Sequence, residues 1–214
     1  MTTPFELSPS LLLSAYAGGS FPMAETRTSS RIFWFSPERR GIFPLNEFHI
    51  SRSLRRQILR DDYTIRTDTD FEGVLRGCAG RPETWINPAI HHAYLDLHRT
   101  GHAHSLEVWV ENELVGGVYG VTIGGAFFGE SMFSKRPNAS KVALAYLVDR
   151  LKEAGFILFD TQFLTDHLAS LGAVEISKAD YLKRLRTALD VDADFTAPDV
   201  PQPSGMLQRM SQTS

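Results

Sequence analysis

Three strand-like segments joined by two-residue turns occupy the middle of this 214-residue chain. Residues 105–110, 113–123 and 126–134 alternate or are continuously apolar, and the pairs Glu111-Asn112 and Gly124-Gly125 separate them. Such short loops join neighbouring antiparallel strands. The pattern therefore predicts an antiparallel meander, which restricts the folds open to the rest of the chain.

A helix and a buried strand are expected after the meander. Asn138 is placed to cap a helix whose leucines share one face and which ends at Gly155, and residues 156–164 form an apolar run. Further helical patterns cover residues 9–17, 51–60, 71–78 and 90–97, and residues 31–35 and 63–67 are strand candidates. The order of elements predicts an α+β fold with a mostly antiparallel sheet, matching the central part of a GCN5-type (GNAT-like) acyltransferase domain.

Three regions are expected along the chain. Residues 81–88, RPETWINP, carry two prolines and no periodicity, which predicts a junction. We therefore expect residues 1–84 to form a small N-terminal domain that contains a basic helix. Residues 85–195 are expected to form a GNAT-like catalytic domain. Residues 196–214 contain three prolines and polar residues without periodicity, so disorder is expected there.

Composition excludes several classes of protein. No apolar run approaches the ~20 residues that cross a bilayer, and the first residues lack the features of a signal peptide. The single cysteine, Cys78, excludes an internal disulfide framework and fits a cytoplasmic location. A net charge of −3 argues against bulk electrostatic binding of nucleic acid but allows a local basic patch. The histidines show no metal-site spacing, so no metal is expected. No cofactor is expected either, and a monomer is the default oligomeric state.

Asp160 and Gln162 are the strongest candidates for a site. They stand two apart in an apolar run, and side chains at i and i+2 of a strand point to one face. Burying a carboxylate and a carboxamide costs several kcal/mol, roughly, unless they bond each other or a ligand. A structural polar pair at a strand end is the alternative.

Two further charged features each allow more than one interpretation. Arginines at positions 52, 55, 56 and 60 lie on one side of a predicted helix, which suits RNA phosphates or a solvated surface. Glu130, at the end of the third meander strand, could act in a site or pair with Lys135 or Arg136. Trp34 and Trp109 lie within strand patterns and are expected in the core.

Ten ordered motifs between residues 7 and 186 resemble leucyl/phenylalanyl-tRNA–protein transferases. They are YAGGSFPM, WFSPERRGIFPL, FHISRSLRR, TWI, GHAHSLEVWVENELVGGVYGV, FFGESMFS, NASKVAL, FDTQ, DHLASLGA and DYL. The resemblance implies an aminoacyltransferase that moves leucine or phenylalanine, with methionine as a further candidate, from aminoacyl-tRNA to proteins with N-terminal arginine or lysine, marking them for degradation.

The resemblance also implies roles for particular residues. Asp160 would orient the Gln162 amide so that its carbonyl accepts a hydrogen bond from the attacking amine. Glu130 would complete the catalytic group, where it could recognise a cationic N-terminal side chain or bond the terminal adenosine of the tRNA. Binding of tRNA and its terminal adenosine would fall to Trp85, Arg52, Arg56 and Ser131. The aminoacyl pocket would be lined by Val118, Phe127, Leu144, Leu147, Leu151 and Phe159. Met23 and Val118 stand where many members have tryptophan and methionine.

Two other functions fit parts of the sequence. An acetyl-CoA-dependent N-acetyltransferase would share the fold, but the connection SKRPNASK before the predicted helix lacks the glycines of a pyrophosphate loop. A non-catalytic RNA-binding module would explain the arginines but leaves Asp160 and Gln162 without a role.

Overall fold

The structure is a computed structural model that describes residues 7–60 and 62–211. The first half comprises α1 (Pro9–Ala17), β1 (Phe21–Ala24), β2 (Ile32–Phe35), β3 (Arg39–Phe43), α2 (Arg52–Leu59), β4 (Thr64–Thr67), α3 (Phe71–Ala79) and α4 (Pro88–Arg99). The second half comprises β5 (Ala103–Val110), β6 (Glu113–Ile123), β7 (Ala126–Ser134), α5 (Ala139–Glu153), β8 (Leu158–Gln162), α6 (Asp166–Ala169), β9 (Val174–Ser177), α7 (Lys178–Leu189) and α8 (Pro203–Ser211). The chain is therefore α+β, as expected.

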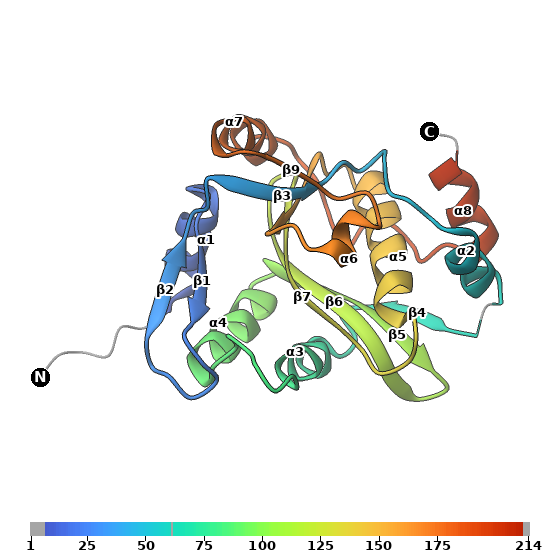
Figure 1. Ribbon diagram of the computed structural model, residues 1–214, viewed down its shortest axis with the longest axis horizontal. Helices are drawn as coiled ribbons and strands as arrows, with labels where there is room; N and C mark the ends of the chain where they lie inside the picture. Colours follow the sequence, from blue (N-terminus) through green and yellow to red (C-terminus); the bar gives the residue numbers. More distant parts are fainter. Residues whose placement is uncertain (1–6, 61, 212–214) are drawn as a thin grey trace, which may run out of the picture.

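A seven-stranded sheet in the order β4-β5-β6-β7-β8-β3-β9 forms the centre of the molecule (Figure 1). The predicted meander is present, because β5, β6 and β7 pair antiparallel in sequence order. The sheet as a whole is mixed, since β8 runs parallel to β7. Beyond Phe128 and Asp160 the register between these two strands ends, and the site described below lies at that divergence.

Strands from both sides of the expected junction at residue 84 share this sheet. β4 pairs with β5 at one edge, and β3 lies between β8 and β9 near the other. The predicted boundary therefore does not divide the sheet. β1 and β2 form a separate two-stranded hairpin.

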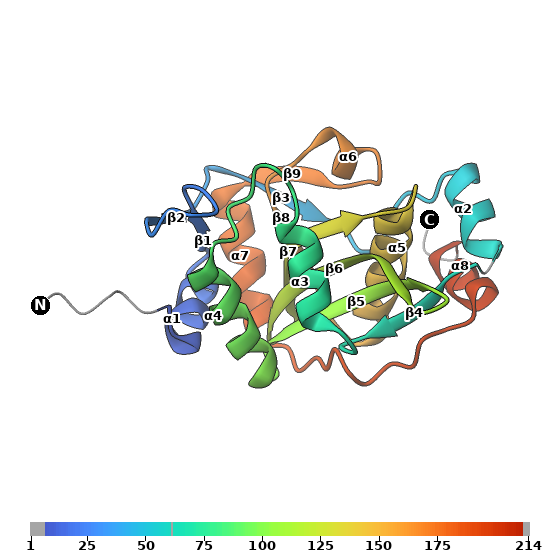
Figure 2. The same ribbon diagram turned by 90° about the horizontal axis from the view of Figure 1, so that it is seen from below.

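Two hydrophobic cores cover the two faces of the sheet. One contains apolar side chains of α2, α5 and α8, and the other contains those of α1, α3, α4 and α7. Figure 2, seen from below, shows α3 and α4 in front of the strands and α5 beyond them. Neighbouring β7 residues alternate between the cores, since Phe127 belongs to the first and Phe128 to the second.

Three local expectations need correction. The expected disorder after residue 196 is wrong for Pro203–Ser211, because this segment forms α8 and Arg209 binds the buried Asp149 through hydrogen bonds of 2.9 and 2.5 Å. Asn138 occupies the N-cap position of α5, but its side chain makes no capping bond and its φ is 67°. Trp34 is 37% exposed on the β1–β2 hairpin rather than buried in the core.

Candidate active site

Glu130 is buried at the point where β7 and β8 diverge, and three side chains donate hydrogen bonds to it. The hydroxyls of Tyr16 and Tyr94 lie 2.6 and 2.7 Å from its two carboxylate oxygens. The side-chain Nε2 of Gln162 lies 2.8 Å from Oε1. The proposed ion pair with Lys135 or Arg136 is therefore wrong, and Lys135 instead lies 3.8 Å from Glu113.

Burial changes the acidity of Glu130. Loss of solvent raises the pKa of this carboxyl from 4.5 to about 7, and the nearby Asp160 charge adds to the increase. The bonds from Tyr16, Tyr94 and Gln162 oppose it because they stabilise the ionised form. A carboxyl group with a pKa near the working pH can both accept and return a proton.

Asp160 has a different environment. Arg40 donates to both of its oxygens, from Nε at 2.9 Å and from Nη2 at 2.6 Å, and Tyr181 donates its hydroxyl at 2.9 Å. The guanidinium also lies 4.6 Å from the centre of the Phe21 ring and 4.4 Å from that of Tyr181. This carboxylate is thus committed to a buried ion pair, and its neighbours fix it in place.

Gln162 links these two acidic groups through different atoms. Its backbone N–H donates to Asp160 Oδ1 at 2.8 Å, and its side-chain amide donates to Glu130. The residue has a φ of 64°, a left-handed conformation that is uncommon for a side chain of this kind. The expectation that Asp160 orients the Gln162 side-chain amide is therefore wrong. Glu130 orients the amide, and Asp160 holds the backbone.

A small pocket opens beside Glu130. Its volume is about 80 Å³. Its lining comprises Val118, Gly129, Glu130, Ser131, Met132, Leu144, Phe159, Thr161 and Leu168. Three of the six expected wall residues are therefore present. Phe127, Leu147 and Leu151 are buried in the core behind these walls and do not line the pocket, whereas Met132 and Leu168 do so without having been predicted.

The expected tRNA-binding residues fall in two places. Trp85 packs edge-on against Tyr94, with ring centres 6.5 Å apart, and Ser131 lines the small pocket. Both therefore lie close to Glu130. Arg52 and Arg56 are exposed on α2, whose Leu54 and Ile58 are buried against the core, and α2 packs on α5 and α8 away from the pocket.

Four residues of the site were not predicted: Arg40, Tyr16, Tyr94 and Tyr181. Tyr94 lies on a predicted apolar helical stripe, and its hydroxyl is the only sign that this face meets a polar group. Arg40 stands in the segment RRGIF between two turns, where an arginine is typical of the surface. Within the described ranges, no group of three or more His, Cys, Asp or Glu side chains could hold a metal ion. No helix there has the length and apolar content to span a bilayer.

Comparison with solved structures bears on the fold. A structure of FemX aligns with a TM-score of 0.53 at 11% identity, covering 66% of this chain and 60% of that one. At such low identity the likeness concerns the fold alone.

Comparison with families and relatives is more specific. The profile described as "Leucyl/phenylalanyl-tRNA protein transferase" matches residues 42–186, and that of the N-terminal domain of the same family matches residues 5–38. Relatives called leucyl/phenylalanyl-tRNA–protein transferase include one from Ruegeria sp. (strain TM1040), 61% identical over 97% of this chain and 99% of its own length. Another, from Cereibacter sphaeroides (strain ATCC 17025), is 62% identical over 99% and 100%. The chain belongs to the leucyl/phenylalanyl-tRNA–protein transferase family and is a transferase.

Proposed function

We propose that this protein transfers leucine or phenylalanine from aminoacyl-tRNA to the α-amine of proteins that begin with arginine or lysine, and that Glu130 and Gln162 carry the reaction. The single observation behind the proposal is the 2.8 Å bond between these two side chains at the wall of a small apolar pocket. An aminoacyl side chain in the pocket would bring its ester to this pair.

The reaction forms one bond and breaks another. The amine nitrogen bonds to the ester carbonyl carbon, the bond from that carbon to the ribose oxygen breaks, and one amine proton ends on the ribose oxygen. Because Glu130 accepts from Nε2 of Gln162, the amide carbonyl of Gln162 is directed away from Glu130 and is available to orient the amine. Glu130 takes the proton and returns it to the leaving oxygen.

Orientation supplies most of the acceleration in this proposal. The ester is already activated, and an α-amine with a pKa of ~7.7–8.0 is partly neutral at cellular pH. Holding amine and ester together can contribute ~7–11 kcal/mol to lowering the barrier. The Arg40–Asp160 pair supports this role indirectly, because Asp160 fixes the Gln162 backbone.

The arrangement of the catalytic half is consistent with a GNAT-like unit. β5, β6 and β7 run antiparallel, α5 follows, and β8 returns parallel to β7. We assign residues 85–195 to this unit and residues 1–84 to a region that completes the sheet and carries α2. Action as a cytoplasmic monomer belongs to the same proposal.

One assay tests the proposed function. Purified protein is mixed with an arginine-started peptide and with labelled leucyl-tRNA, phenylalanyl-tRNA or acetyl-CoA in separate reactions. Label should reach the peptide from the two charged tRNAs and not from acetyl-CoA. A peptide that begins with glutamate is the matched control acceptor and should stay unlabelled. Transfer from acetyl-CoA alone would identify an N-acetyltransferase, and binding of tRNA without transfer would identify an RNA-binding module.

A further inference from the structure

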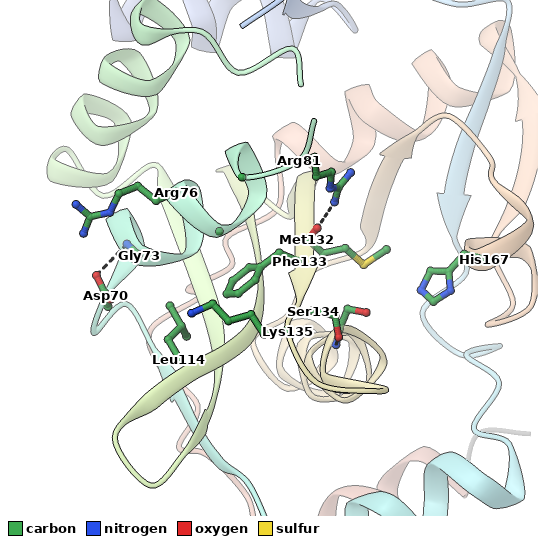
Figure 3. A pocket seen from close by; sticks show the side chains of 13 residues that line it. Asp70, Gly73, Arg76, Arg81, Leu114, Met132, Phe133, Ser134, Lys135 and His167 are labelled. Carbon is green, nitrogen blue, oxygen red and sulfur yellow. Dashed lines mark hydrogen bonds between the residues drawn. The ribbon is translucent and has the colours of Figure 1, made fainter. Parts of the chain in front are cut away.

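A cavity of about 760 Å³ lies between α3, the end of β7, the start of α5 and α6. Six of the residues that line it are Arg76, Arg81, Met132, Ser134, Lys135 and His167. Figure 3 shows these side chains around one opening, with Arg76 and Arg81 on the α3 side and His167 opposite. We call this opening the α3–α6 cleft.

The α3–α6 cleft adjoins the candidate active site. Met132 lines both the cleft and the small pocket beside Glu130. Arg81 donates a hydrogen bond to the Met132 carbonyl, which ties the rim of the cleft to β7. A molecule whose end occupies the small pocket could therefore continue into the cleft.

The cleft carries positive charge. Arg76, Arg81 and Lys135 are cations of its lining, while the carboxylate of Asp70 accepts the Gly73 backbone N–H as the N-cap of α3. Burial and the nearby Lys141 lower the pKa of His167, so this ring is neutral at neutral pH and adds no charge. The lining as a whole attracts anions.

Two of these cations are held only loosely. The Arg76 side chain is 64% exposed and lies 3.4 Å from Glu72, and the Lys135 side chain is 56% exposed and lies 3.8 Å from Glu113. Exposed pairs of this kind contribute little to stability. Both side chains can therefore exchange their partner for a ligand oxygen without disturbing the fold.

We infer that the α3–α6 cleft binds the single-stranded 3′ end of the tRNA, with Arg76 and Lys135 contacting the phosphodiesters that precede the terminal adenosine. This inference rests on the proposed function. With the aminoacyl group in the small pocket, the nucleotides behind it need a path outward, and this basic cleft adjoins that pocket. A cavity of this size admits a strand but not a duplex, and an acceptor with a cationic N-terminus would be repelled.

The position of α2 supports the same path. This helix packs against α5, whose first turn borders the cleft at Ser140. Tyr63, just after α2, donates to the Pro137 carbonyl at 3.4 Å, in the loop that also carries Lys135. The cleft thus lies between Glu130 and the arginines of α2. The duplex part of the tRNA would begin at these arginines.

Three phenylalanyl donors separate the parts of this path. Phenylalanyl-adenosine has no phosphodiester, the phenylalanyl CCA trinucleotide has only those of the 3′ end, and phenylalanyl-tRNA has all of them. The double variant Arg76→Gln/Lys135→Gln should transfer normally from the adenosine donor and poorly from the other two. For the trinucleotide, the slope of log K against log salt should fall by about 0.7 for each phosphate that the variant no longer neutralises. An Arg52→Gln/Arg56→Gln variant should need a higher concentration of charged tRNA for half-maximal transfer, and should match wild type with the two smaller donors.

Matched variants guard against a folding artefact. Arg99→Gln/Arg186→Gln removes the same charge from exposed sites outside the cleft and should match wild type with every donor. Glu72→Gln/Glu113→Gln frees the two cations and should tighten trinucleotide binding. An unchanged trinucleotide salt slope, equal losses with adenosine and trinucleotide, or a change confined to the concentration dependence of the acceptor peptide would overturn the inference. Failure of wild type with all three donors would instead refute the proposed function.

Discussion

The Arg40 guanidinium and the Asp160 carboxylate form an ion pair inside the protein, with 1% and 0% of their side chains exposed. Removing one partner of a buried pair leaves an uncompensated charge and costs about 3–5 kcal/mol. Arg40→Ala should therefore lower the free energy of unfolding in urea by that amount. Arg31→Ala, which breaks an exposed pair with Glu25, should cost less than about 1 kcal/mol. Similar costs for the two variants would contradict the assignment of Arg40.

Gln162→Ala should reduce turnover without reducing tRNA affinity. The variant removes the amide that faces the amine but leaves its backbone bond to Asp160 possible. We expect a decrease of ~10²-fold or more in single-turnover transfer, since the variant removes both the group that positions the amine and a hydrogen-bond donor to Glu130. Gln202→Ala, at an exposed position, is the control. Full activity of Gln162→Ala would remove this residue from the reaction.

Glu130 should make stability depend on pH in an unusual direction. Its pKa is raised from 4.5 to about 7 in the folded state, so the folded protein binds a proton more tightly than the unfolded chain. The resulting stabilisation is complete below pH 4.5 and is lost as the pH rises to about 7, a change of roughly 3 kcal/mol. Urea unfolding at about pH 5 and about pH 8, on either side of the raised pKa, measures it, and Glu130→Gln should lack this component. Parallel pH profiles for the two proteins would show that the carboxyl titrates normally.

The same group should shape the pH dependence of transfer. Ionised Glu130 is the proton acceptor, so single-turnover transfer should rise as the pH increases through about 7. Because the α-amine of an ordinary peptide titrates in a similar pH range, the pH profile is also measured with a peptide whose N-terminal amine is weakly basic. If the pH of the inflection shifts fully with the pKa of the peptide amine, the inflection reports the amine and not Glu130.

The α2 arginines should contribute to tRNA affinity and not to chemistry. Arg52→Ala/Arg56→Ala should weaken binding of charged tRNA and reduce the salt slope by ~0.7–0.9 for each phosphate left without its arginine, with turnover at saturating tRNA unchanged. Arg99→Ala/Arg186→Ala is the charge-matched control. If both double variants show the wild-type salt slope, the α2 arginines are ordinary surface residues.

Val118 should set the size of the aminoacyl group. It lines the 80 Å³ pocket together with Leu144 and Phe159, and one methylene there is worth only ~1–3 kcal/mol. Val118→Phe should therefore impair transfer of phenylalanine more than that of leucine. Transfer from both charged tRNAs to one peptide gives the ratio directly, and equal losses would place the aminoacyl group elsewhere.

The sequence predicted those elements whose signals are local. Ser8 caps α1, Gly80 ends α3, and the two-residue turns of the meander lie between β5, β6 and β7. β3 and β9 were missed because neither alternates clearly, and their pairing is with strands distant in sequence. α8 was missed because its proline-rich approach resembles a disordered tail, whereas Arg209 and the buried apolar side chains hold it.

The site was predicted by residue type better than by the partners of each side chain. The strand pattern predicted Asp160 and Gln162 on one face, and Glu130, which the resemblance implied, lies beside them in the structure. Strand periodicity does not describe the left-handed backbone at Gln162. For this reason Asp160 was expected to bind the side-chain amide of Gln162, whereas it binds the backbone N–H and Glu130 binds the amide. Tyr16 and Arg40 reach the site from α1 and β3, and such long-range interactions leave no periodic signal in one sequence.

The place of β3 in the sheet affects how the chain can fold during synthesis. β3 pairs with β8 and β9, and Arg40 is 120 residues ahead of its carboxylate partner. At roughly 5–20 residues per second, a ribosome would take about 6–24 s to add those residues. Throughout that interval β3 has neither of its partner strands and Arg40 lacks its carboxylate. Unpaired strand edges favour aggregation, so this segment is one that a chaperone at the ribosome would protect.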